Sequence, residues 1–150
     1  MEQTDPAVIN QWLGSVLAPL NPGQRRRFFR QLASDLQRSQ SDRIKAQQNP
    51  DGSAFQPRKP RQKKGAVRQR AMFARIRNRK NLRRASSAEH AEVGFNRRMG
   101  RIAEVHQHGL VSEVSKGGPL VKYAQRQLLG LSAADIDRIE QSALQFLQGD

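Results

Sequence analysis

The sequence predicts an α+β fold in which N-terminal and C-terminal helices pack around a small antiparallel sheet, with a long basic loop between them. Three observations support this prediction. Apolar residues recur at helical spacing near both ends of the chain, and they alternate with other residues over 91–95. Between these regions lies a proline-bearing stretch rich in lysine and arginine. At 150 residues the chain is expected to form one domain, 1–150.

Two helices are expected within residues 5–47. The first begins near Pro6, which suits a first helical turn, and apolar residues then recur at i, i+3, i+4 and i+7 until Pro19. The second is capped by Asn21. Its apolar stripe thins beyond Leu36, so we expect its first half to be packed and its second half to be solvated or set against a partner.

Residues 67–130 are expected to hold the sheet and several short helices. The period-2 pattern of alternating side chains indicates strands, and short helical spacings that end at glycine indicate helices. The expected elements are a short helix around 71–76, strands at 82–85 and 91–95, a short helix at 101–108 and a brief strand at 120–124.

A final helix is expected over 132–148. Ser132 and Asp135 have the spacing of a capping box, with aspartate in the place usually taken by glutamate. The apolar residues that follow recur at helical spacing and predict one buried face. That face consists of Ile136, Ile139, Ala143, Leu144 and Leu147.

The net charge of +14 is concentrated in the middle of the chain. From Arg58 to Arg84 there are 13 lysines and arginines and no acidic residue, and 56–66 is expected to be a basic loop. Solvated faces usually mix both signs, so this stretch predicts contact with DNA phosphates or with an acidic protein neighbour, between which the sequence does not decide. A solvated charged loop is the remaining alternative. The residues expected to make the contact are Arg58, Lys59, Arg61, Lys63, Lys64, Arg68 and Arg70.

Catalysis, cofactors and membrane insertion have no support in the sequence. Without cysteine, a P-loop, a nucleophile elbow or clustered carboxylates, the chain is expected to be neither an enzyme nor a cofactor or metal binder. His106 and His108 lie two residues apart in an expected helix and therefore face apart, so we expect His106 to pack beside the turn at Gly109. No apolar run could span a bilayer, and the acidic N-terminus is unlike a signal peptide, which indicates a cytoplasmic product without a membrane partner.

Several large apolar side chains are candidates for a subunit interface. The hydrophobic fraction of 36% predicts a thin core, for which oligomerisation is a common compensation. Aromatic residues are also enriched at interface hot spots. The alternative is an ordinary place in the core, and for the two leucines a buried corner before the last helix. The candidates are Trp12, Phe28, Phe73, Leu128 and Leu129.

Segments distributed along the chain together resemble a known family. From about Leu20 onward, their order and spacing resemble the phage virion morphogenesis family, the tail-completion proteins of contractile-tailed temperate phages. One departure is Gln127, where the Arg-Pro-Leu-Leu-Gly string of the family has proline. The segments are 21–27 (NPGQRRR), 36–40 (LQRSQ), 43–53 (RIKAQQNPDGS), 55–59 (FQPRK), 72–73 (MF), 103–109 (AEVHQHG) and 126–132 (RQLLGLS).

The resemblance implies a non-enzymatic virion protein that completes the tail at the head–tail junction. It implies a place in the tail or neck of the virion, after assembly in the host cytoplasm. The implied partners are further copies of the chain in a homo-oligomeric ring, sixfold by resemblance, other neck and tail proteins, and phage DNA in the channel. The alternative function is a stand-alone basic nucleic-acid-binding protein, which explains the charge but not the order of the segments.

Overall fold

The computed structural model describes residues 6–58 and 71–149, and over these residues the expected α+β fold is confirmed. The described residues form two separate two-stranded antiparallel sheets, where one small sheet was expected. None of the helices within this described part is long and apolar enough to cross a membrane. The elements are α1 (Pro6–Leu17), α2 (Pro22–Lys45), β1 (Leu82–Ser86), β2 (Ala91–Phe95), α3 (Arg97–His108), β3 (Val111–Glu113), β4 (Leu120–Lys122) and α4 (Ala133–Leu147).

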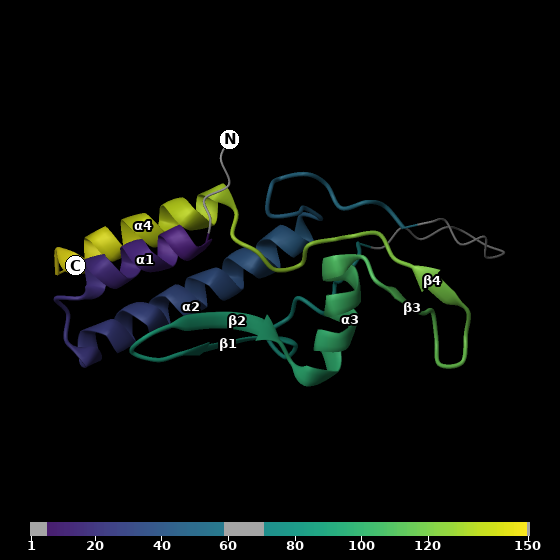
Figure 1. Ribbon diagram of the computed structural model, residues 1–150, viewed down its shortest axis with the longest axis horizontal. Helices are drawn as coiled ribbons and strands as arrows, with labels where there is room; N and C mark the ends of the chain where they lie inside the picture. Colours follow the sequence, from purple (N-terminus) through teal and green to yellow (C-terminus); the bar gives the residue numbers. More distant parts are fainter. Residues whose placement is uncertain (1–5, 59–70, 150) are drawn as a thin grey trace.

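The long helix α2 is the element around which the others are arranged. A capping box fixes its start, because the Asn21 side chain accepts from the backbone N–H of Gln24 while the Gln24 side chain accepts from that of Asn21. Helices α1 and α4 lie side by side next to α2, and the β1–β2 hairpin also runs along α2 (Figure 1). The tip of the hairpin comes close to α1, because Ala88 and His90 line the same cavity as Leu13. Helix α3 and the β3–β4 hairpin lie beyond the C-terminal end of α2, which makes the molecule elongated (Figure 1).

The second half of α2 buries one face within the subunit, so the expectation of a solvated or partner-bound half was wrong. Gln37 and Gln40 are 7% and 3% exposed, and Ile44 is fully buried. The Gln37 side chain donates to the carbonyl of Leu82 at 2.6 Å, across the junction with β1. Apolar periodicity underestimated this burial because the helix buries polar side chains whose hydrogen bonds are made inside the fold.

Two apolar clusters lie along the molecule. The first fills the space between α1, α2 and α4, and the second lies at the C-terminal end of α2, where α3 and the loops meet it. Burying one large apolar side chain contributes about 1.5–3 kcal/mol. The first cluster contains Ile9, Leu13, Leu17, Phe28, Phe29, Leu32, Ile139 and Ala143. The second contains Ile44, Phe55, Met72, Ile76, Ala103 and Leu128.

Some local expectations were wrong. Residues 71–76 form turns and not a short helix, because Phe73 has a left-handed backbone with φ of 66°. Helix α3 begins before the expected start at 101, since the Asn96 side chain caps it by accepting from the N–H of Met99. Strand β3 was not expected, because its three residues are too few to show alternation.

Candidate functional site at the base of the basic segment

The chain that leads into the basic segment, residues 58–70, is held by the second apolar cluster. Phe55 is 4% exposed in that cluster. The guanidinium of Arg126, itself 6% exposed, donates through Nε to the carbonyl of Gln56 at 2.7 Å and through Nη2 to that of Pro57 at 3.3 Å. Arg58, the first residue of the basic segment, follows directly and is exposed. The direction in which the chain enters the segment is therefore fixed.

The chain that returns from the basic segment is fastened to the same cluster. The side-chain amide of Gln47 accepts from the N–H of Met72 at 3.0 Å and donates to the carbonyl of Met72 at 2.9 Å. Met72 is buried next to Phe55 in the second cluster, and Phe73 packs edge-on against Phe55 with ring centroids 5.8 Å apart. The residues on both sides of the basic segment, 55–58 and 72–73, are therefore held together at the second cluster, and we call this place the base of the segment.

His106 packs against the residues of this base. Its ring packs edge-on between Phe73 and Tyr123, with centroid distances of 4.8 and 5.1 Å, and its Nδ1 lies 3.4 Å from Nη1 of Arg126. Burial, together with the charges of Arg126 and Arg58, lowers the pKa of His106 to about 4. The ring is therefore neutral at neutral pH, and its Nδ1 accepts a hydrogen bond from Arg126.

The packing of His106 confirms the expectation that it serves the fold beside the Gly109 turn. Glu104 and His108, which lie two residues from His106 and have side chains of the types that bind metal ions, are exposed on the surface of α3. Within the described part of the chain, no group of three or more His, Cys, Asp or Glu side chains is placed to hold a metal ion. The charged groups that the structure describes at this site are the guanidinium groups of Arg58 and Arg126.

The positive charge at the base has no carboxylate beside it. Burial and then the neighbouring charge of Arg58 lower the pKa of Arg126, and no acidic group contributes to either shift at Arg126 or His106. Among the described residues the ion pair found is between His90 and Glu92, at 4.0 Å, far from this base in the hairpin tip. Arg126 is buried and bonded within the fold, so the guanidinium at this base that a phosphate or a carboxylate from another molecule can pair with is that of the exposed Arg58.

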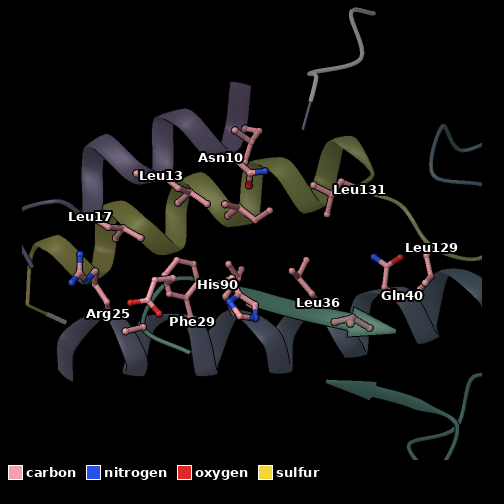
Figure 2. Close-up of a pocket in the computed structure, with 18 of the residues that line it drawn as sticks. Asn10, Leu13, Leu17, Arg25, Phe29, Leu36, Gln40, His90, Leu129 and Leu131 are labelled. Atoms are coloured by element: carbon pink, nitrogen blue, oxygen red, sulfur yellow. The ribbon is translucent and has the colours of Figure 1, made fainter. Parts of the chain in front are cut away.

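A cavity of about 630 Å³ lies at a second place, between α1, α2, the tip of the β1–β2 hairpin and residues 129–131 (Figure 2). Its walls are mostly apolar, with Leu13 and Phe29 among them, while Arg25 and His90 bring polar groups to its edge (Figure 2). The Nε atom of Arg25 is buried without a hydrogen-bond partner in the described structure. Such walls suit an apolar side chain better than a charged substrate.

The match between the chain and known proteins extends over the whole fold just described. The sequence model of the phage virion morphogenesis family matches residues 5–148, which include both apolar clusters and the basic segment. The chain belongs to this family. The resemblance noted in the sequence is thereby confirmed, and a role in virion morphogenesis follows from it.

A relative within the virion morphogenesis family is tail completion protein S of Escherichia phage P2. It is 37% identical over 140 residues, which cover 91% of this chain and 93% of the relative. No solved structure matches the chain.

The expected contact residues of the basic segment are only partly visible in the structure. Arg58 is exposed at the base, beside Arg126 and His106. The other six expected residues, Lys59, Arg61, Lys63, Lys64, Arg68 and Arg70, lie outside the described residues. Arg126 could not be singled out from the sequence, because its contacts with Gln56 and Pro57 join positions about 70 residues apart. Its signal in the sequence was its place at the start of the RQLLG string, which resembles the Arg-Pro-Leu-Leu-Gly string of the family.

The expected interface residues fall into two groups. Phe28, at 2% exposure, and Leu128, at 0%, are part of the subunit's own apolar clusters. Trp12, Phe73 and Leu129 are half-buried and keep some surface that a neighbour could cover. Of these, Leu129 lines the cavity between α1 and α2 (Figure 2). A contact of these residues with another subunit stays a prediction.

Proposed function

We propose that this family member completes the phage tail where it joins the head, and that it does so as a non-enzymatic structural subunit. The observation that carries this proposal is the 37% identity to tail completion protein S over 91% of this chain and 93% of that protein. A match that spans nearly all of both chains relates the whole fold rather than one motif. The subunit then belongs to the tail or neck of the virion, after assembly in the host cytoplasm.

The subunits form a homo-oligomeric ring around the DNA channel, sixfold by family resemblance, and contact other neck and tail proteins. Closed cyclic symmetry is the usual arrangement of identical subunits. Support comes from large apolar side chains that the described part of the subunit leaves exposed, among them Ile102 and Leu144 at 50% and 48%. Exposed apolar surface of this kind is typical of an assembly interface.

The basic segment contacts a polyanion or an acidic neighbour, and DNA in the channel is the first candidate. Seven lysines and arginines lie between residues 58 and 70 without an acidic residue. At the described base, Arg58 and Arg126 add charge that no carboxylate compensates. Because lysine and arginine pair with phosphates regardless of base sequence, such contact suits DNA that passes through a channel.

Deletion and complementation test the tail-completion role. In the phage or prophage that encodes this chain, removal of its gene should leave DNA-filled heads and tails that are not joined, as counted by negative-stain electron microscopy of lysates. Supply of the chain from a plasmid should restore joined particles. A normal yield of joined, infectious particles without the gene would contradict the proposal.

The role of the basic segment is tested by the salt dependence of DNA binding. The affinity for a labelled duplex, measured by fluorescence anisotropy, should fall steeply as salt rises from 50 to 200 mM, with a log–log slope of about −0.9 per neutralised phosphate. The variant Lys59→Gln/Arg61→Gln/Lys63→Gln/Lys64→Gln should reduce that slope by about 3–4, if each residue meets one phosphate.

A matched control separates the segment from net charge alone. Arg26→Gln/Arg30→Gln/Arg38→Gln/Arg138→Gln removes the same number of charges from exposed positions outside the basic stretch. It should leave the slope within about one unit of the wild-type value. Equal losses in both variants would show that DNA responds only to the overall charge, and the segment would then have no special role in DNA contact.

A further inference from the structure

The exposed large apolar side chains of the described residues gather in two separate regions. One region is on the outer side of α1 and α4, and the other is on α3 and the β3–β4 hairpin. Figure 1 shows these regions apart along the long axis of the molecule, so they do not cover each other within one subunit. The first region contains Val8, Leu144 and Leu147, and the second contains Ile102, Leu110, Val111, Val114 and Leu120.

The outer face of α4 carries an acidic and apolar stripe. Asp137, Glu140, Leu144 and Leu147 recur at i, i+3, i+7 and i+10, which places them on one side of the helix. The adjoining face carries the fully buried Ala143 and belongs to the first apolar cluster. The stripe therefore has carboxylates near the N-terminal half of α4 and exposed leucines near its C-terminal half.

The outer face of α3 carries the complementary stripe. Arg98, Arg101, Ile102 and Val105 recur at i, i+3, i+4 and i+7, while Ala103 on the inner face is buried in the second cluster. The arginines are exposed, Ile102 is 50% exposed and Val105 is half-buried. Here too the charged residues come first along the helix and the apolar residues follow.

The two stripes carry opposite charges, and neither is neutralised by ion pairs among the described residues of its own subunit. Apart from the buried Asp135, α4 carries two carboxylates and one arginine, a net charge of −1. Helix α3 carries three arginines and one glutamate, a net charge of +2 before its histidines are counted. No ion pair within the described chain involves the charged residues of either stripe. Charges left unpaired beside exposed apolar groups are typical of a surface that pairs on assembly.

We propose that the α4 stripe of one copy docks on the α3 stripe of the next copy, as the contact that joins subunits head to tail. The inference rests on the self-assembly in the proposed function and adds which surfaces meet. A parallel arrangement of the two helices places Asp137 and Glu140 opposite Arg98 and Arg101. The same register places Leu144 opposite Val105, next to Ile102. Because the two surfaces differ, the contact is heterologous and builds a ring when the rotation between copies closes.

Charge reversal and mixing test this contact. Asp137→Arg/Glu140→Arg and Arg98→Glu/Arg101→Glu should each raise the concentration at which the protein assembles by at least about tenfold, since each juxtaposes like charges. The measurement is light scattering coupled to size-exclusion chromatography in 150 mM salt. An equimolar mixture of the two variants should assemble again, because each α4 stripe then meets an oppositely charged α3 stripe on the other variant.

The control carries the same change in charge elsewhere. Asp42→Arg/Glu92→Arg reverses two exposed carboxylates on α2 and β2 and should assemble as the wild type does. Thermal melting followed by circular dichroism checks that each variant is folded. If one reversal variant does not fold, the variant that reverses the other stripe still tests the contact. Unchanged assembly in both reversal variants, or a mixture that stays monomeric, would overturn the inference.

The test of the α3–α4 contact and the test of tail completion can fail independently of each other. A wild-type chain that is monomeric at every concentration would also overturn this contact, while joining of heads and tails in the complementation assay would still support tail completion. Conversely, restored assembly in the mixture would support the contact between α3 and α4 even if removal of the gene left particle yield unchanged.

Discussion

Arg126 and His106 show how two side chains determine where the basic segment leaves the fold. Arg126 holds the carbonyls of Gln56 and Pro57, and the His106 ring supports the same guanidinium through Nδ1. The arrangement needs a neutral imidazole, because a protonated ring would place a third positive charge beside Arg58 and Arg126. The burial that makes the base rigid therefore also makes it sensitive to pH.

We predict that His106 makes the fold less stable in acid. Its folded-state pKa is about 4 against an ordinary 6.5, so as the pH falls the unfolded chain binds the proton first. Stability should be lost between about pH 6.5 and 4, by about 1–2 kcal/mol after allowance for the partly exposed ring. Urea unfolding at several pH values should show that His106→Gln lacks this part of the pH dependence.

The exposed His108 on the same helix provides the matched control. His108→Gln should keep the wild-type pH profile of the free energy of unfolding, because its ring lies on the surface of α3. If His106→Gln and His108→Gln had equal profiles, the acid sensitivity would have to come from the carboxylates instead.

At the scale of elements, a polar joint connects α2 to the segment that leads into α4. Arg43 donates to the carbonyls of Gln48, Gln127 and Leu128 at 3.1, 3.0 and 2.9 Å. It also donates to the Gln40 side chain at 2.6 Å. The joint continues to Asp135, which accepts from Gln40 and Ser39 on α2 and caps α4 together with Ser132. These hydrogen bonds fasten α2 to the start of α4, in addition to the apolar contacts that the two helices make in the first cluster.

We predict that Arg43→Met destabilises the protein by about 2–4 kcal/mol, because it leaves buried carbonyls without donors. Chemical denaturation followed by circular dichroism measures the loss. Arg38→Met, at an exposed position on the same helix, should change the free energy of unfolding by less than about 0.5 kcal/mol. A loss at Arg43 no greater than that at Arg38 would mean that the joint adds little to the stability.

At the scale of the whole molecule, α2 is shared by both apolar clusters. Phe28, Phe29 and Leu32 on its first half belong to the first cluster, and Ile44 at its other end belongs to the second. A single helix of 24 residues therefore runs between them. Because a helix depends on tertiary packing for most of its stability, loss of either cluster weakens the support for the other.

We predict that the two clusters unfold as one unit. Leu128→Ala in the second cluster should lower the free energy of unfolding by about 2–5 kcal/mol. The same loss should be seen in the fluorescence of Trp12, the single tryptophan, which packs against the first cluster. If the urea midpoint reported by Trp12 did not move while that of the far-UV circular dichroism did, the two ends would unfold independently.

The sequence by itself determined the regular elements at both ends of the chain. The apolar spacing of α1 and the first half of α2, and the capping box at Ser132, are local signals that lie within a few residues of one another. The strands β1 and β2 were predicted on the same basis. The order of the family segments was also sufficient to indicate the phage virion morphogenesis family.

Only the tertiary structure decided which distant residues meet. Arg126 reaches the carbonyls before the basic segment, Gln47 pairs with Met72 after it, and Gly130 lies so close to Pro50 that an added Cβ would be 2.6 Å from its Cγ. None of these contacts leaves a periodic trace in the sequence, because each depends on hydrogen bonds or close packing between segments that folding brings together. The same reason explains why the opposing stripes of α3 and α4 become visible only when the buried faces are known.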